Sequence, residues 1–284
     1  MPLGPTVRRR RLGAELRRLR EANSLKLEEV AEQLGLAPST LSRIETGKAP
    51  TKTAYLTSML GMYGVDDPAV RKVLVDMARE GHRKGWWSIY DDVLPSGFDI
   101  YVGLEAEASG LRSYETDLVH GLLQTTEYAL TVLRELRPKD SDEQILRGVD
   151  LRMQRQRLLD HDPPLDLWLI LDEGAIRRTI GGAKVMGPQL GHLIQASRRS
   201  NVTLQVLGFE AGAHAGLVGP FSILEFPERG DSEVAYTESV GGMIYLEKER
   251  EVRACAEAFD RMRAAALSPA ASVELIQQVL EELT

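Results

Sequence analysis

The chain has 284 residues, of which 43% are hydrophobic and 27% charged, and its formal net charge is −7. This composition fits a globular protein of one large or two smaller domains. The single cysteine, Cys255, excludes an intramolecular disulfide and a thiolate zinc cluster, and its helical neighbours favour a buried apolar role. There is no 18-residue apolar stretch and no secretory signal pattern, which predicts a cytoplasmic protein without membrane contact.

Charge is distributed unevenly along the chain. Residues 1–84 carry 16 Lys and Arg against 10 Asp and Glu, whereas the remaining residues carry 19 against 32. A basic head on an acidic body predicts that only the head lies along nucleic acid. Four arginines, Arg8, Arg9, Arg10 and Arg11, precede the first predicted helix. They are interpreted as a phosphate-contacting arm, with a solubilising terminus as the alternative.

Four short hydrophobic stripes with helical spacing follow, and they predict an all-α bundle. The stripes are Leu12, Leu16 and Leu19; Leu27, Val30, Ala31 and Leu34; Leu41 and Ile44; and Tyr55, Leu56, Met59, Leu60 and Tyr63. Gly35 allows the second helix to end sharply, and Pro38 suits the first turn of the third. A helix, a tight turn and a second helix are therefore predicted over residues 26–48.

The second helix of this pair is predicted to present a polar row to solvent. With Leu41 and Ile44 facing inward, Ser39, Thr40, Ser42 and Arg43 remain outside. A short helix with such a row is suited to the major groove of double-stranded DNA. The predicted DNA-binding residues are Ser39, Thr40, Ser42, Arg43 and Lys48, together with Arg8, Arg9, Arg10 and Arg11.

Residues 8–65 resemble the phage-repressor-like (XRE-type) helix-turn-helix domain. The resemblance is carried by Glu29, Ala31, Leu34, Gly35, Leu41, Ser42, Ile44, Glu45, Gly47 and Lys48. Two places depart from the family. Lys26 stands where Ser or Thr usually caps a helix, and Ala37 and Pro38 stand where a Ser followed by Gln or Arg is frequent. Base readout is therefore expected to depend on the polar row and on apolar contacts with thymine methyl groups.

A connecting segment is predicted over residues 66–87. It begins Asp-Asp-Pro, a helix start, and continues with Val70, Val73, Leu74 and Met77 at helical spacing. The adjacent Trp86 and Trp87 are interpreted as packing between domains or subunits, with a stacking site for an aromatic ligand as the alternative.

Residues 88–284 alternate between helical and extended patterns, so the predicted fold is α+β overall, with an all-α head (1–65) and a mixed α/β second domain (88–284). Helices are predicted over 105–113, 126–136, 143–159, 185–200, 247–267 and 270–283. Strands are predicted over 165–171, 202–207, 221–226, 234–237 and 243–246.

The second domain resembles the C-terminal domain of a group of actinobacterial antitoxin-like transcriptional regulators. The matching residues include Trp86-Trp87, Glu105 to Ala108, Gly121 to Thr125, Arg152 to Gln156, Gly181-Gly182 and Gly219 to Phe221. His120 departs from the family, which usually has Pro there. The resemblance implies transcriptional regulation, often beside a small partner protein encoded next door.

Few residues of the second domain indicate chemistry. Five histidines show neither an i, i+4 pair nor an HExxH arrangement, so no metal and no cofactor are expected. Asp172 and Glu173 could act as an acid–base pair, but they also suit a helix N-terminus, which is preferred. There is no nucleophile elbow or phosphate-binding loop, and the protein is predicted not to be an enzyme.

The glycine-rich loop from Gly212 to Pro220 is the main candidate for binding a ligand or partner. His214 and Gly216 lie near its middle, and Glu105 and Gln124 are secondary candidates. The predicted function is that of a homodimeric DNA-binding transcriptional regulator. Its second domain is expected to serve in sensing, dimerisation or partner binding, with a small-molecule effector or a small protein as the possible partner. The alternatives are an antitoxin-like repressor and an enzyme with a DNA-targeting head.

Overall fold

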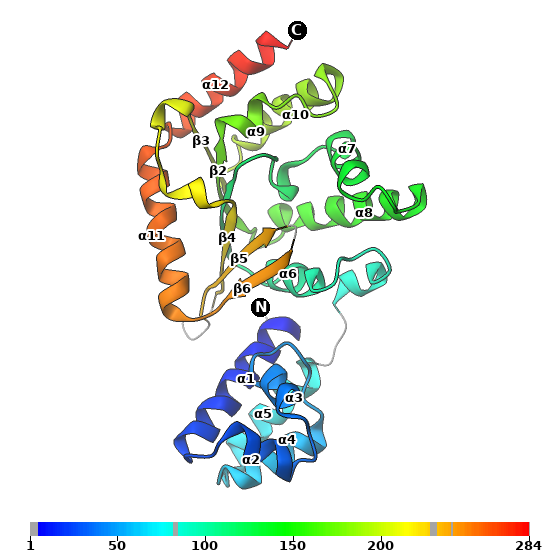
Figure 1. Ribbon diagram of the computed structural model, residues 1–284, viewed down its shortest axis with the longest axis vertical. Helices are drawn as coiled ribbons and strands as arrows, with labels where there is room; N and C mark the ends of the chain where they lie inside the picture. The colour runs from blue at the N-terminus through cyan, green and yellow to red at the C-terminus, as the bar shows by residue number, and fades with distance from the viewer. Residues whose placement is uncertain (1–4, 82–84, 228–231, 240, 284) are drawn as a thin grey trace. The chain divides into compact units, whose positions relative to one another are not determined.

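The computed structural model describes residues 5–81, 85–227, 232–239 and 241–283 (Figure 1). The chain divides into two compact units. The first comprises Met1–Ile89 and Asp99–Glu107, and the second comprises Tyr90–Phe98 and Ala108–Thr284. The fold is α+β, as predicted, since the first unit is helical and the second contains a six-stranded sheet.

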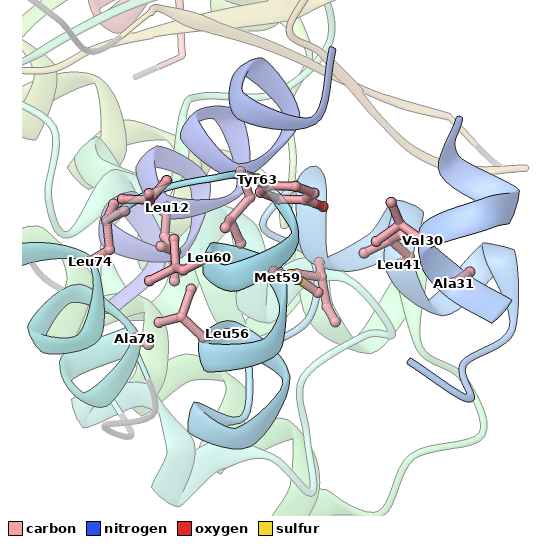
Figure 2. Close-up of a cluster of buried hydrophobic side chains, with 13 residues drawn as sticks. Leu12, Val30, Ala31, Leu41, Leu56, Met59, Leu60, Tyr63, Leu74 and Ala78 are labelled. Carbon is pink, nitrogen blue, oxygen red and sulfur yellow. The ribbon is translucent and has the colours of Figure 1, made fainter. Parts of the chain in front are cut away.

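The first unit is a helical bundle whose order follows the predicted stripes. Its helices are α1 (Pro5–Ala22), α2 (Leu27–Gln33), α3 (Pro38–Glu45), α4 (Thr53–Met62) and α5 (Pro68–Gly81), followed by a 3₁₀ helix, η1 (Trp86–Tyr90), and by most of α6 (Phe98–Glu105). One buried cluster takes residues from all of the first five helices, as Figure 2 shows for Leu12, Leu41, Leu56 and Leu74. Shared burial of these stripes fixes the helices against one another.

Two predictions for this unit need correction. The arginine run at residues 8–11 does not precede the first helix but lies within α1. The stripe predicted on residues 70–77 is out of phase, because Val70 and Val73 are 42% and 53% exposed. Leu74 and Ala78 are the residues of α5 that enter the buried cluster. Helix α5 therefore packs in the helical bundle, whereas a connecting segment was predicted from residue 66.

The second unit is built on a mixed sheet with strand order β3-β2-β1-β4-β5-β6. The strands are β1 (Gly110–Glu115), β2 (Asp166–Asp172), β3 (Val202–Leu207), β4 (Phe221–Glu225), β5 (Val234–Ser239) and β6 (Gly242–Leu246). Strands β1, β2 and β3 are parallel, whereas β4, β5 and β6 pair antiparallel. Strand β1 is thus the central strand at which the sheet changes from parallel to antiparallel pairing.

Helices cover both faces of this sheet. They are α7 (Thr126–Leu136), α8 (Asp142–Gln156), α9 (Glu173–Arg177), α10 (Ala183–Ala196), α11 (Glu249–Ala265) and α12 (Pro269–Glu282). Figure 1 shows α11 on one side of the sheet and α8 on the other. Tyr114 of β1 and Ile170 of β2 pack with Phe259 and Met262 of α11 in one buried cluster. The opposite face of β1 therefore looks toward α8, because alternate residues of a strand point to opposite faces.

The predicted helix over residues 105–113 is wrong. Helix α6 ends at Glu105, and residues from Gly110 onward form β1. The register pairs Leu111 with Leu167 on one side and with Leu224 on the other. Pairing with two distant strands outweighs the local helical pattern at this position. The remaining predicted strands and helices of the second unit are confirmed, with boundaries that differ by a few residues.

Candidate DNA interface and candidate sites of the second unit

Helix α3 presents the polar row that its sequence predicts. Leu41 and Ile44 are buried, whereas Ser39, Thr40, Ser42 and Arg43 are all exposed. Lys48, just beyond the helix, is exposed as well. Hydroxyl groups and one guanidinium on a single exposed helical face can donate to base edges and phosphate oxygens.

The turn before α3 has the backbone that a helix-turn-helix needs. Gly35 lies at φ +64°, a left-handed conformation that costs glycine little. Pro38 occupies the first turn of α3, where a backbone N–H would lack a helical partner. At the start of α2 the backbone N–H of Lys26 donates to the Glu29 carboxylate over 3.0 Å. Glu29 thus supplies a capping contact at a position where the side chain of Lys26 accepts no capping hydrogen bond.

A buried ion pair between α1 and α3 was not predicted. Arg20 Nε donates to Glu45 Oε1 over 2.7 Å, and Nη2 donates to Oε2 over 2.9 Å. Arg20 also donates through Nη1 to the Leu25 carbonyl oxygen. Spacing could have revealed this contact, because Arg20 continues the i, i+4 series of Leu12 and Leu16 and therefore takes a core position.

Close backbone contact between α1 and the α3 region fixes the position of α3 further. A Cβ atom on Gly13 would lie 2.5 Å from the carbonyl oxygen of Ile44. A Cβ on Gly47, which has a φ of +68°, would lie 2.6 Å from Arg10 Cα. Both glycines therefore permit an approach that any larger residue would prevent.

Arg8, Arg9, Arg10 and Arg11 are half-buried on α1 and are not an extended arm. Burial lowers the pKa of Arg9, while the nearby carboxylates of Glu107 and Asp99 oppose that shift. The Val7 backbone N–H donates to Glu107 Oε2 over 2.7 Å. The start of α1 is thus tied to residues 99–107 of the same unit. Phosphate contacts by Arg8, Arg9, Arg10 and Arg11 stay a prediction.

His214 and Gly216 belong to a polar cluster on the α11 side of the sheet. The Gly216 backbone N–H donates to His214 Nδ1 over 3.2 Å, and His214 Nε2 lies 4.0 Å from Asp172 Oδ2. The Tyr114 hydroxyl donates to the same carboxylate oxygen over 3.2 Å. A cavity of about 400 Å³ lies beside this cluster, lined by Ala211, Ala213, His214, Ala215, Arg261 and Ala265. Its polar lining groups come from Arg261 and His214, and the rest of the lining is alanine.

Asp172 and Glu173 have structural roles. Asp172 Oδ1 accepts the Gly174 backbone N–H over 2.8 Å and so caps α9. Glu173 Oε1 accepts from Arg177 over 2.6 Å, and Oε2 accepts the Phe209 backbone N–H over 2.8 Å. These contacts fit the preferred capping interpretation, because both carboxylates are engaged in holding the ends of β2 and β3.

The two secondary candidates do not join the His214 cluster. Glu105 is fully buried and belongs to the first compact unit. Gln124 is buried, donates to the Val119 carbonyl oxygen over 2.6 Å and accepts from Arg152 Nη1 over 2.5 Å. His120, where the resemblance expects Pro, accepts the Leu122 backbone N–H and so caps the short 3₁₀ helix η2 (Gly121–Leu123). These contacts place Gln124 and His120 beside α8.

Within the described part of the chain, no group of three or more His, Cys, Asp or Glu side chains is arranged to hold a metal ion. His82 lies outside the described residues. None of the helices in the described ranges is long and apolar enough to cross a membrane.

Comparison with known families assigns both parts of the chain. Residues 98–278 match the domain of unknown function DUF5753. The chain belongs to the DUF5753 family. Residues 11–73 match a helix-turn-helix domain, which indicates a DNA-binding regulator. No curated protein and no solved structure matches the chain.

The two matched ranges follow the helices and strands of the structure. The helix-turn-helix match contains α2, α3 and α4 whole and ends within α5. The DUF5753 match begins at Phe98, the first residue of α6, and includes all six strands. It therefore contains both the His214 cluster and the surroundings of Gln124.

Proposed function

We propose that this DUF5753 protein is a sequence-specific transcriptional regulator whose second unit controls the DNA-binding activity of the first. One observation carries the proposal. Helix α3 exposes Ser39, Thr40, Ser42 and Arg43 while its other face is held on α1 by the buried Arg20–Glu45 pair. A rigidly seated helix with an exposed row of donors can reproduce one register in the major groove.

We further propose that the protein acts as a homodimer. A single helix-turn-helix head reads few base pairs, and dimers of such heads bind two half-sites about one helical turn apart. The charge distribution supports DNA binding by the first unit and a different role for the second. The basic residues concentrate in 1–84, and the acidic remainder would be repelled by phosphates.

Selection of bound duplexes from a random library by the full-length protein tests this function. The expected product is an inverted repeat whose half-site centres are about 10 base pairs, or a multiple of that, apart. Sedimentation of the free protein at micromolar concentration should show a dimer. Recovery of no enriched sequence would contradict sequence-specific binding, and a monomer both free and on DNA would contradict the dimer.

A second candidate is an antitoxin-like repressor whose second unit binds a small partner protein. The supporting observation is apolar surface near the His214 cluster, where Leu217 and Val218 are 70% and 91% exposed and Phe209 is 61% exposed. Exposed apolar side chains that lie together mark protein contacts more often than isolated ones do.

Titration of the purified protein with the product of an adjacent small reading frame tests this candidate. Leu217→Ser combined with Val218→Ser should weaken such binding at least tenfold, whereas Leu146→Ser, a change at an exposed leucine of α8, should not. Absence of binding by the wild-type protein would remove this candidate and leave the regulator proposal untouched.

A further inference from the structure

A row of hydroxyl groups crosses the sheet face that looks toward α8. The strand register places Ser113 of β1 opposite Ser222 of β4, Ser222 opposite Tyr236 of β5, and Tyr236 opposite Tyr245 of β6. Residues paired across strands project from the same face, so these four side chains form one continuous row. Ser113, Ser222 and Tyr236 are all buried. Buried positions between a sheet and a helix are usually apolar, so a buried row of hydroxyl groups here is unusual and points to a specific role.

The row is hydrogen-bonded to one carboxylate near the carboxyl end of β1 and to another near the carboxyl end of β5. Ser113 Oγ lies 2.9 Å from Ser222 Oγ and donates to Glu115 Oε1 over 3.0 Å. The Tyr236 hydroxyl donates to Glu238 Oε2 over 2.9 Å. Strand β1 lies where the sheet changes from parallel pairing with β2 to antiparallel pairing with β4.

Two arginines of α8 lie opposite this row. Arg155 is only 4% exposed, and its guanidinium lies 5.2 Å from the centre of the Phe98 ring. A Cβ atom on Gly121 would be 3.5 Å from Arg155 Nη1, so the 3₁₀ helix η2 closes over the guanidinium. Arg152 donates to Gln124 from the same helix face. Both arginine side chains lie close enough to Glu115 to lower the pKa of its carboxyl group.

Glu115 and Arg152 are both half-buried, so each side chain keeps some accessible surface. Burial nevertheless raises the pKa of Glu115 to about 7 and lowers the pKa of Arg152 to about 10. A group on an open surface would be solvated by water and would show neither shift. The neighbouring Arg155 also lowers the pKa of Arg152, because two like charges in a desolvated place repel each other.

We propose that the Ser113–Ser222–Tyr236 row and the Arg152–Arg155 pair form a binding site for a small organic oxyanion that carries hydroxyl groups. Guanidinium groups recognise carboxylate and phosphate oxygens through paired hydrogen bonds, and an anion between them relieves their repulsion. The serine and tyrosine hydroxyls can accept from and donate to ligand hydroxyls. This inference rests on the proposed function as a regulator. It adds the chemical class of the effector that the second unit would bind.

Thermal unfolding of the full-length protein tests the site without DNA. Probes are inorganic phosphate, tartrate and succinate, each compared with sodium chloride at equal ionic strength. Phosphate or tartrate should raise the wild-type melting temperature by about 2–4 °C at saturating millimolar concentration. Succinate, which lacks the hydroxyls of tartrate, should produce a smaller shift. A response to phosphate alone assigns a phosphorylated effector, and a response to tartrate alone assigns a hydroxy acid.

Matched variants test whether the shift in melting temperature comes from anion binding at this site. Arg152→Gln should abolish the shift, whereas Arg157→Gln, an exposed arginine at the end of the same helix, should retain it. Tyr236→Phe should remove the advantage of tartrate over succinate, and it remains informative if Arg152→Gln fails to fold. No shift with either anion, or an equal shift in Arg152→Gln, would overturn the proposal. Because the readout does not involve DNA, such a failure leaves operator binding by α3 to be judged separately.

Discussion

The Arg20 guanidinium and the Glu45 carboxylate form a buried, doubly hydrogen-bonded pair that joins α1 to the last residue of α3. Their side chains are among the few charged groups of the first unit that are largely removed from water. Tyr63 lies close by, and burial together with the Glu45 charge raises its pKa to about 12. The orientation of the helix that is proposed to read DNA therefore depends on a charge pair in the core.

Breaking this pair should destabilise the protein strongly. We expect Glu45→Gln to lower the free energy of unfolding by about 3 kcal/mol, because the Arg20 charge stays buried without a carboxylate. Arg20→Met combined with Glu45→Leu should recover most of that loss. Denaturant unfolding measures both changes. Glu21→Gln, at an exposed carboxylate of α1, serves as the control and should cost under about 1 kcal/mol. Equal losses for Glu45→Gln and Glu21→Gln would refute the structural role of the pair.

Arg43→Ala should weaken specific DNA binding without affecting the fold. Arg43 is exposed on α3, and a bidentate contact with a guanine edge contributes about 1–3 kcal/mol of discrimination. Electrophoretic mobility shift on the selected site should therefore show about a 5- to 150-fold loss of affinity. Arg18→Ala removes the same positive charge from the exposed face of α1 and provides the comparison. Wild-type affinity in Arg43→Ala would show that this face of α3 does not read bases.

Gly216 is required by packing rather than by loop flexibility. A Cβ atom there would lie 2.3 Å from Tyr114 Cε1 and 2.5 Å from Met262 Sδ. Gly216→Ala should therefore lower the free energy of unfolding by about 1–3 kcal/mol through overpacking. Gly191→Ala in α10 meets no heavy atom within 4 Å and should instead stabilise the protein by about 0.5–1 kcal/mol. The proposal fails if chemical denaturation ranks the two variants in the opposite order.

The Glu115 carboxyl should make stability depend on pH in a defined direction. Burial raises its pKa to about 7, with Glu238 adding to the shift and Ser113, Arg152 and Arg155 opposing it. The unfolded chain releases this proton near pH 4.3, at about the ordinary pKa of Glu. Between those values the folded state holds more protons, so the free energy of unfolding falls as pH rises toward 7.

Glu115→Gln imitates the protonated carboxyl and isolates this contribution. The variant should match wild type near pH 4 and exceed it by about 3–4 kcal/mol at pH 8. Urea unfolding across this range measures the difference, and the exposed Glu257→Gln should show a difference that does not change with pH. A constant offset between Glu115→Gln and wild type would show that the folded protein does not raise this pKa.

The first unit could be predicted largely from its sequence. Helices α1 to α4 are consecutive, and each shows a hydrophobic stripe at helical spacing, so local periodicity indicates both the helix and its buried face. For α5 the pattern indicates the helix, but Val70 and Val73 of the predicted stripe are exposed. Gly35 and Pro38 mark the turn through their own backbone preferences, and the exposed row of α3 follows once Leu41 and Ile44 are assigned to the core. Strands β2 and β3 were predictable for a similar reason, as short apolar runs between clear breaks.

Tertiary structure alone decided the features that depend on distant partners. Strand β1 takes its conformation from pairing with β2 and β4, and its own residues carry a pattern that also suits a helix. The Arg20–Glu45 pair joins residues 25 positions apart. The hydroxyl row is set by strand register, which brings Ser113 beside Ser222 although 109 positions separate them. Propensity and periodicity act over neighbouring residues, whereas burial of charge and cross-strand contact arise only once the chain has folded.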